Sequence, residues 1–240
     1  MLDCTLFLVV DDVHLSELLV SYPSWCTYHP EVAGFQHFML YDSNLDVRDV
    51  RFREFEAMAC KYGAPGLNME PWSFPAAETQ REKMLTAYIK GVESIKTKWY
   101  LKIDTDTFGA ESDKPLVDMS WFSNSPAYIA KAQRVTRTGG IYDDIDRWAE
   151  GIPELAALPK PDHRWVPGKG YIHPTRRMTS WVMFGNTAWT RGAYRFCNGG
   201  RLPVPSQDTY LSYIALRTGA HHRHVNFKRR GWSHRRPRRK

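Results

Sequence analysis

The sequence predicts an α/β fold with a mixed, mostly parallel sheet flanked by helices. Its first hundred residues alternate in the order strand, helix, strand, helix, helix, strand, which is typical of parallel α/β sheets. The last of these strands is followed by two aspartates, Asp104 and Asp106, with one residue between them. With 240 residues, 42% of them hydrophobic, the chain is long and apolar enough for one large domain or two small ones.

Strand-like segments are apolar or alternate apolar with polar residues, and turn residues bound each of them. They are predicted at residues 5–10, 35–41, 99–103, 127–132, 180–184 and 222–227. Helical patterns separate the first strands. They cover residues 14–22, where Pro23 is expected to end the helix, residues 47–62, and residues 80–96, where apolar side chains form one face.

Acidic residues follow three of the predicted strands. Asp11 and Asp12 follow the first, Asp42 the second, and Asp104 and Asp106 the third. Because ligands bind beyond the carboxyl ends of parallel strands, we expect these residues to lie at one binding edge. In an extended backbone, positions i and i+2 face the same side, so the last pair can converge on one cation. Mg²⁺ and Mn²⁺ prefer carboxylate oxygens and commonly share them with a substrate diphosphate.

A second acidic pair, Asp144 and Asp146, lies in a stretch rich in Gly, Asp and Arg. That stretch is predicted to be loop, with a short helix near residues 143–150, inside a long insertion over residues 135–177. The metal site is therefore assigned to Asp104 and Asp106.

Residues 205–214 look like the start of a helix, with Ser206 as the N-cap and Asp208 in the first turn. One interpretation of Asp208 is a favourable interaction with the helix dipole. The other is a general base that deprotonates an acceptor hydroxyl.

These features together resemble the GT-A class of nucleotide-sugar-dependent glycosyltransferases over roughly residues 4–228. The resemblance rests on the order of the first strand, Leu40-Tyr41-Asp42-Ser43, Arg81 in the helix before the metal strand, Ile103-Asp104-Thr105-Asp106, and Gln207-Asp208. It implies a GT-A-like (Rossmann-like) domain over residues 1–228, with a nucleotide-sugar-binding half at 1–108 and an acceptor-binding half at 109–228. Residues 229–240 would form a basic tail.

The resemblance also implies roles for individual residues. Asp104 and Asp106 would coordinate Mn²⁺ or Mg²⁺ on the donor diphosphate, and Asp208 would act as the base of an inverting enzyme. Donor-binding residues are expected at the same edge, with a UDP-sugar as the expected donor. They are Asp11, Asp42 for the nucleobase, Arg81 for the nucleotide, Asp104 and Thr105.

Many enzymes of this class use a late histidine as a further metal ligand. The resemblance makes His234 the first candidate and His224 the second. His222 and His224 alternate on a predicted strand, so one face can hold both.

Positive charge is concentrated at the end of the sequence. Of the 33 Lys and Arg, eight fall in residues 228–240, which leaves 25 against 26 acidic residues elsewhere. Such a block either stays solvated or contacts a polyanion, so an anionic glycan, DNA or a membrane surface is a predicted partner.

The cysteines Cys4, Cys26, Cys60 and Cys197 are widely spaced and are predicted to be buried free thiols. The sequence starts without a basic leader, and no apolar segment approaches the ~20 residues that cross a bilayer. A cytoplasmic, soluble protein is expected, peripheral at most to a membrane or to nucleic acid.

The sequence therefore predicts a metal-dependent glycosyltransferase that moves a hexose or pentose to an acceptor hydroxyl, with a glycan preferred over a modified DNA base or a lipid-linked glycan. A metal-dependent nucleotidyltransferase or nuclease is the alternative, because paired acids also bind metals for phosphoryl transfer. A third hypothesis is a nucleic-acid-binding protein without catalysis, which rests on the basic tail and a pI near 9.2.

Overall fold

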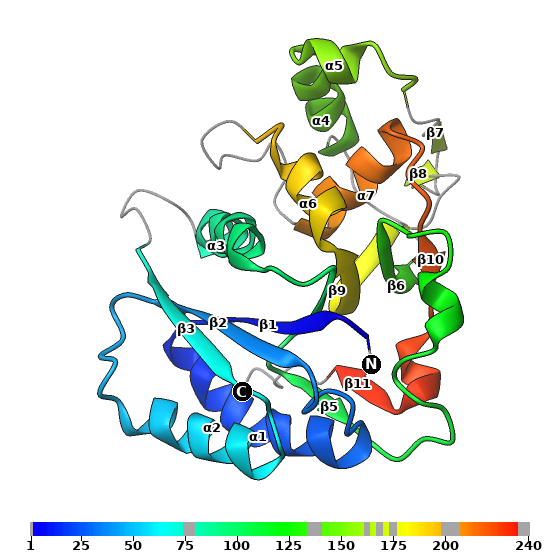
Figure 1. The fold of residues 1–240 in the computed structure, drawn as a ribbon. Helices are drawn as coiled ribbons and strands as arrows, with labels where there is room; N and C mark the ends of the chain where they lie inside the picture. Colours follow the sequence, from blue (N-terminus) through cyan, green and yellow to red (C-terminus); the bar gives the residue numbers. More distant parts are fainter. Residues whose placement is uncertain are drawn as a thin grey trace.

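A seven-stranded sheet with helices on both faces forms the frame of the protein (Figure 1). The computed structural model describes residues 2–73, 80–133, 141–160, 164–166, 170–172, 177–197 and 207–234. In spatial order the sheet contains β10 (Arg223–His224), β6 (Tyr128–Gln133), β9 (Arg177–Asn186), β4 (Trp99–Ile103), β1 (Cys4–Val10), β2 (Gln36–Asp42) and β3 (Leu67–Trp72).

Helices and smaller elements complete the described part of the chain. The α-helices are α1 (Asp12–Tyr28), α2 (Val50–Lys61), α3 (Gln80–Ser94), α4 (Ile141–Glu150), α5 (Pro153–Ala156), α6 (Thr187–Tyr194) and α7 (Gln207–Arg217). Two short sheets pair β5 (Thr107–Gly109) with β11 (Trp232–His234) and β7 (Arg164–Val166) with β8 (Gly170–Ile172). The 3-10 helices are η1 (Met119–Phe122) and η3 (Phe227–Arg230).

The large sheet is mostly parallel. Strand β1 pairs in parallel with β2 and β4, β3 pairs in parallel with β2, and β10 in parallel with β6. Strand β9 alone runs against its neighbours, because it is antiparallel to both β4 and β6. The predicted α/β fold with a mixed, mostly parallel sheet is therefore confirmed.

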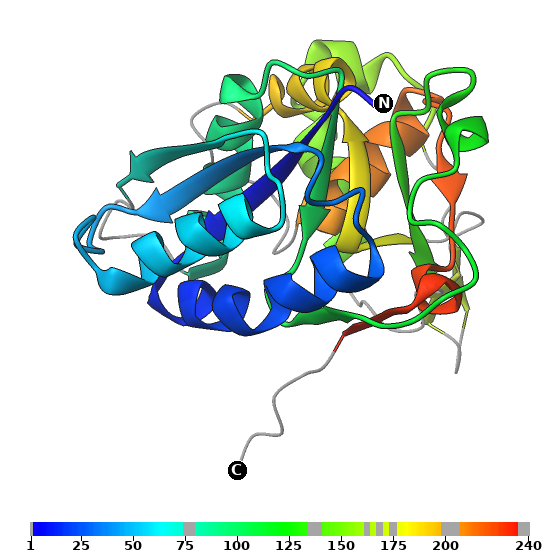
Figure 2. The ribbon, with the colours of Figure 1, turned by 60° about the horizontal axis from the view of Figure 1, so that its bottom comes forward.

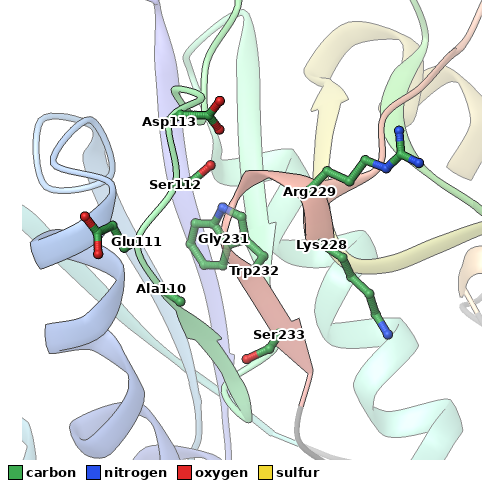
Figure 3. Close-up of a pocket in the computed structure, with 9 residues that line it drawn as sticks. All are labelled: Ala110, Glu111, Ser112, Asp113, Lys228, Arg229, Gly231, Trp232 and Ser233. Carbon is green, nitrogen blue, oxygen red and sulfur yellow. The ribbon is translucent and has the colours of Figure 1, made fainter.

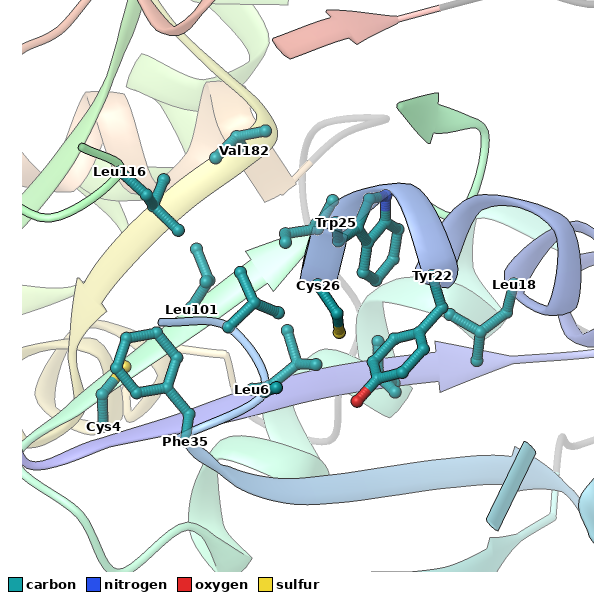
Figure 4. Packing of buried hydrophobic residues seen from close by; sticks show 14 of the residues in the cluster. Cys4, Leu6, Leu18, Tyr22, Trp25, Cys26, Phe35, Leu101, Leu116 and Val182 are labelled. Carbon is teal, nitrogen blue, oxygen red and sulfur yellow. The ribbon is translucent and has the colours of Figure 1, made fainter. Parts of the chain in front are cut away.

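The core is divided by the sheet into two apolar layers. Leu6 and Leu8 of β1 belong to the layer that contains α1 and α2, two helices that lie side by side under the sheet (Figure 2). Figure 4 shows Leu6 packed near Cys26 of α1. Phe7 and Val9 face the opposite layer, which contains α3, α6 and α7. This alternation along one strand, with every residue of β1 buried, is the pattern of a central strand covered on both faces.

Helix α1 continues past Pro23, so the predicted end of this helix is wrong. A proline inside a helix removes one backbone hydrogen bond and costs about 3 kcal/mol or more. Burial offsets that cost here, because the residues after Pro23 include Trp25, which is fully buried and donates its indole N–H to the backbone oxygen of Thr107 at 2.5 Å.

Five of the described strands were not predicted, namely β3, β5, β7, β8 and β11, and one strand was predicted too long. Strand β3 is an edge strand with several exposed residues and contains Pro71, so it has no apolar run to identify it. Strands β5, β7, β8 and β11 are only three residues each. Between residues 222 and 227, only Arg223 and His224 pair as a strand.

Residues 229–234, expected to be part of a basic tail, are folded into η3 and β11. Residues 227–230 form η3 and residues 232–234 form β11, with Trp232 only 1% exposed. The many basic residues around Trp232 made this segment look solvated in the sequence. The packing of Trp232 keeps the segment against the rest of the protein.

All four cysteines are unpaired, and three are buried. Cys60 is exposed, against the expectation, because it lies on the solvent side of α2. Within the described ranges, no helix has both the length and the apolar character needed to cross a membrane.

Candidate active site at the carboxyl edge of the sheet

The three predicted acidic strand ends lie at one edge of the sheet. Strands β1, β2 and β4 are parallel, so their carboxyl ends point the same way. Asp11 follows β1, Asp42 ends β2 and Asp104 follows β4. Open α/β sheets bind ligands at this edge.

Asp104 and Asp106 lie in a tight turn that joins β4 to β5. The backbone N–H of Asp104 donates to the oxygen of Trp181 at 2.8 Å, and that of Thr107 donates to the oxygen of Asp104 at 2.9 Å. These bonds fix the turn against β9 and close it on itself. The side chain of Asp104 is 33% exposed, and Asp106 is also partly exposed, so a ligand can reach both.

Thr105, between the two aspartates, is directed into the protein. Its hydroxyl donates to Oε2 of Glu17 in α1 at 2.6 Å, and the residue is buried. The contact fastens the turn to α1. The hydroxyl of Thr105 thus anchors the turn, and a donor contact by this residue stays a prediction.

Asp11 caps the N-terminus of α1. Its Oδ1 accepts from the backbone N–H of His14 at 2.9 Å and lies 2.7 Å from His14 Nδ1. Burial raises the pKa of Asp11, but the bonds from His14 outweigh burial and the net pKa is lowered. Burial lowers the pKa of His14, but the hydrogen bond with Asp11 and the charges of Asp11, Glu17 and Asp104 outweigh burial, so the net pKa is raised.

His14 and Glu17 were missed by sequence reasoning. They are three residues apart in α1, so they lie on one face of the helix that follows β1. Since Asp11 is the N-cap of the same helix, this spacing is a signal that could have grouped them with the site.

The side chain of Asp42 makes the hydrogen bonds that are typical of a turn residue. Its Oδ1 accepts from the backbone N–H of Asn44 at 2.9 Å and from Asn44 Nδ2 at 2.8 Å. A nucleobase contact by Asp42 stays a prediction. Arg81 lies in the first turn of α3, and its side chain is outside the described part of the structure.

Sequence reasoning gave no role to Lys102, which lies two residues before Asp104 in β4. Lys102 is 4% exposed, its Nζ contacts the Asp104 carboxylate, and the ring centre of Tyr88 in α3 lies 5.2 Å from Nζ. Burial lowers the pKa of Lys102, but its electrostatic interactions with Asp104, Tyr88 and Asp208 outweigh burial, so the net pKa is raised. A lysine in an otherwise apolar central strand was the available signal, because such a charge needs a partner.

Asp208 lies in the first turn of α7, as predicted, and is partly buried. The pKa of Tyr88 is raised to about 12 mainly by burial, and Asp208 and Asp104 both contribute to the rise. Because Asp208 acts on Tyr88 and Lys102, it belongs to the same electrostatic group as Asp104. Ser206, the predicted N-cap, lies outside the described residues.

The second acidic pair has a different setting. Asp146 lies within α4, and its Oδ1 accepts from the hydroxyl of Tyr213 in α7 at 2.5 Å. The side chain of Asp144 is outside the described part of the chain. Asp146 thus links two helices and does not follow a strand.

His234 reaches the neighbourhood of the acidic turn on β11. This strand pairs antiparallel with β5, and its register places His234 opposite Thr107, the residue after Asp106. In the same strand, Trp232 stacks on His29 with ring centres 4.5 Å apart. The side chain of His234 is outside the described part, so its position is known from the backbone alone.

Two glycines allow close packing around β5, one where the chain enters β11 and one against α1. Gly231 has φ +77°, and a Cβ there would lie 2.1 Å from the backbone oxygen of Ala110. A Cβ on Gly109 would lie 2.6 Å from the backbone oxygen of Ser24 in α1. Neither position accommodates a side chain without movement of the backbone.

His224, the second histidine candidate, is placed elsewhere. It lies on β10, three strands from β4 in the sheet, or about 14 Å at the usual strand spacing. Beside it, His222 stacks on Tyr128 with ring centres 5.2 Å apart. The structure does not bring His224 to Asp104.

No protein-family model matches the sequence, and the search of curated proteins finds no match. Solved structures do match. The mannosyltransferase Ktr4p from S. cerevisiae is similar with a TM-score of 0.62 and 11% identity over 90% of this chain and 66% of that protein. Core-mannan synthase A from Aspergillus fumigatus, in an Mn/GDP form, gives a TM-score of 0.60 and 9% identity over 90% of this chain and 70% of that one.

The chain has the GT-A fold. A third match is the mannosyltransferase PcManGT from Pyrobaculum calidifontis in complex with GDP-Man and Mn²⁺, with a TM-score of 0.51 and 10% identity over 93% of this chain and 54% of that protein. The chain thus spans between about half and 70% of the length of these GT-A proteins. At such low identity the matches establish the fold alone.

The donor set at the binding edge of this GT-A sheet suits a hard cation. Among the side chains that the structure describes, no three His, Cys, Asp or Glu are grouped as a complete metal site. Asp104 and Asp106 offer carboxylate oxygens from one turn, and His234 lies beside that turn by its backbone. Hard cations commonly complete their coordination with substrate phosphate and water, so these residues fit a metal held jointly by the protein and a donor.

A recess of about 600 Å³ lies beside the β5–β11 pair of the GT-A fold (Figure 3). Glu111 and Asp113 line it from the chain after β5, and Lys228 and Arg229 line it from η3. The full lining is Ala110, Glu111, Ser112, Asp113, Lys228, Arg229, Gly231, Trp232 and Ser233. Its centre lies toward the end of the two strands opposite to the acidic turn, so it is distinct from the candidate metal site.

Proposed function

We propose that this protein is a metal-dependent glycosyltransferase that moves a sugar from a nucleotide-sugar donor to an acceptor hydroxyl. The observation that carries the proposal is the Asp104-Thr105-Asp106 turn at the carboxyl edge of a GT-A sheet, with Asp208 acting on the same buried lysine as Asp104. Two facts support this proposal. Open α/β sheets bind ligands at this edge, and acidic side chains from separate elements lie there.

Asp104 and Asp106, with His234 beside them, would hold the metal ion. When bound, Mn²⁺ or Mg²⁺ neutralises the negative charge of the departing nucleoside diphosphate. The chain keeps both carboxylates in place through the turn bonds to Trp181 and the anchoring bond from Thr105. This preorganisation avoids a reorganisation cost during the reaction.

Asp208 is the proposed general base. The acceptor oxygen forms a bond to the anomeric carbon, the bond from that carbon to the diphosphate oxygen breaks, and the hydroxyl proton passes to the Asp208 carboxylate. The electron pair of the broken bond leaves with the diphosphate. A single displacement of this kind inverts the anomeric configuration.

The donor is a nucleoside diphosphate sugar. Among nucleotides, UDP-sugars were expected from the sequence, whereas two of the similar structures are described with GDP or GDP-Man. Asp42 and Arg81 are the proposed nucleotide contacts. The sugar can be a hexose or a pentose, and binding measurements with different nucleotide-sugars distinguish the nucleobases.

The proposed acceptor is an anionic glycan. Lys228 and Arg229 are exposed at the recess beside β11, and Arg and Lys fill most of the following segment in the sequence. An acceptor held by these charges loses affinity as salt is raised. A modified DNA base and a lipid-linked glycan at a membrane surface are the other acceptors to be compared.

The first experiment is a thermal-shift panel of UDP-, GDP-, CMP- and dTDP-sugars, each with Mn²⁺, Mg²⁺ or EDTA. A ligand that binds the native state raises the melting temperature by mass action, so one nucleotide class should stabilise the protein and EDTA should abolish the effect.

The second experiment identifies the products of the reaction with the donor that binds. Release of nucleoside diphosphate with sugar transfer supports the proposal, release of pyrophosphate indicates a nucleotidyltransferase, and no donor binding with tight DNA binding contradicts catalysis.

A further inference from the structure

Lys102 is a charged side chain in the middle of the sheet. Its neighbours across β4 are Phe7 in β1 and Met183 in β9, and the residue is 4% exposed. Placing an ammonium group in such surroundings is unfavourable unless opposite charges compensate it. The Asp104 carboxylate supplies such a charge, because Lys102 Nζ contacts it directly.

The compensating groups come from three different elements. Asp104 at the end of β4 contacts Nζ, Tyr88 of α3 places its ring 5.2 Å from Nζ, and Asp208 of α7 adds a second negative charge. Lys102 therefore contacts the proposed metal ligand directly and interacts electrostatically with the proposed base.

We propose that Lys102 is a positioning residue that makes the site selective for a metal together with a diphosphate over the metal alone. The inference rests on the proposed function. Lys102 holds one side of the Asp104 carboxylate and repels a divalent cation that arrives without a counter-charge. A nucleoside diphosphate brings negative charge that the same ammonium attracts, so metal and nucleotide favour each other's binding.

The test is Lys102→Met, which removes the charge and keeps an unbranched apolar stem. Free Mn²⁺ binding is measured by electron paramagnetic resonance, and GDP and UDP binding at saturating Mn²⁺ by calorimetry. We expect Mn²⁺ alone to bind about tenfold more tightly and the nucleotide about tenfold more weakly. A general structural defect weakens both, so opposite signs distinguish the proposed role.

Two further variants serve as controls. Lys102→Arg keeps the charge and should stay close to wild type in both measurements. Tyr88→Phe removes a neighbouring hydroxyl without removing a cation, so it should not tighten Mn²⁺ binding. If Lys102→Met does not fold, Lys102→Met combined with Asp208→Asn should recover a folded protein, because one of the two uncompensated acids is gone.

The outcomes separate the two proposals. Wild-type protein that binds neither Mn²⁺ nor any nucleotide overturns the proposed function and this inference with it. Wild-type protein that binds both, with a Lys102→Met variant whose two affinities change in the same direction or whose Mn²⁺ affinity is unchanged, overturns the role of Lys102 alone. Failure of the double variant to fold has the same meaning.

Discussion

The backbone of His234 lies opposite Thr107, one residue beyond Asp106, in the antiparallel pair formed by β5 and β11. The pairing joins the acidic turn after β4 to a strand from the opposite end of the described chain. The proposed third metal ligand therefore depends on how β11 packs and not only on the turn itself.

His234→Ala should weaken Mn²⁺ binding at least about tenfold, because loss of a ligand or of its support has effects of this size. His224→Ala is the matched control, since His224 lies on β10 at the other side of the sheet. Mn²⁺ titration of both variants checks the prediction. Equal affinities in the two variants would exclude His234 as a ligand.

Gly231→Ala should destabilise the protein by about 1–3 kcal/mol, because φ is +77° and the new Cβ would lie 2.1 Å from the oxygen of Ala110. Gly192→Ala is the control. A Cβ at Gly192, within α6, meets no atom within 4 Å, so alanine there should stabilise by about 0.5–1 kcal/mol. Urea unfolding measures both, and a destabilised Gly192→Ala protein would contradict the contrast.

Asp104→Asn and Asp106→Asn should each reduce kcat/KM by about 100-fold or more and remove the Mn²⁺-dependent thermal shift with donor. Asp146→Asn tests the same substitution in the second acidic pair, where the carboxylate accepts a hydrogen bond from Tyr213. This variant should retain sugar-transfer activity. Full activity in Asp104→Asn, with metal still required, removes the central claim about the turn.

Asp208→Asn should lower kcat by about 100-fold or more while donor affinity changes little, because a general base acts on the acceptor. Donor calorimetry and initial rates measured on the same preparation separate the two effects. The anomeric configuration of the wild-type product provides an independent check, since a retained configuration is incompatible with the single displacement.

His37 makes the protein sensitive to acid. The ring is buried, Nδ1 donates to the oxygen of Phe35 at 2.8 Å, and Nε2 accepts from the hydroxyl of Tyr22 at 2.7 Å. Burial lowers its pKa to about 4, so the unfolded chain takes up a proton below about pH 6.5 while the folded protein does not. Stability present above pH 6.5 is therefore lost as the pH falls toward 4, by about 2–3 kcal/mol from this group.

Urea unfolding at pH 7.5 and 4.5 tests this prediction. The loss of stability between the two pH values should be about 2–3 kcal/mol smaller in His37→Gln than in wild type. Identical losses in both proteins would mean that His37 is protonated equally in the folded and unfolded states.

The sequence predicted the elements whose signal is local. Strand β4 matches its predicted range, and the turn that follows it was identified from two aspartates after an apolar run. The length of α1 was not predictable, because the burial of Trp25 that offsets Pro23 is a tertiary effect. Strand β11 and the role of Lys102 were missed for the same reason, since each depends on partners distant in the chain.

The burial of Lys102 has a consequence for how this protein tolerates mutation. Acids gathered at an active site repel one another, so substitutions that inactivate an enzyme there commonly make it more stable. In this protein the acids also neutralise an ammonium that the sheet encloses. Inactive variants at Asp104 should therefore have a lower melting temperature than wild type. In related proteins that no longer catalyse the reaction, we expect Lys102 to be replaced together with Asp104.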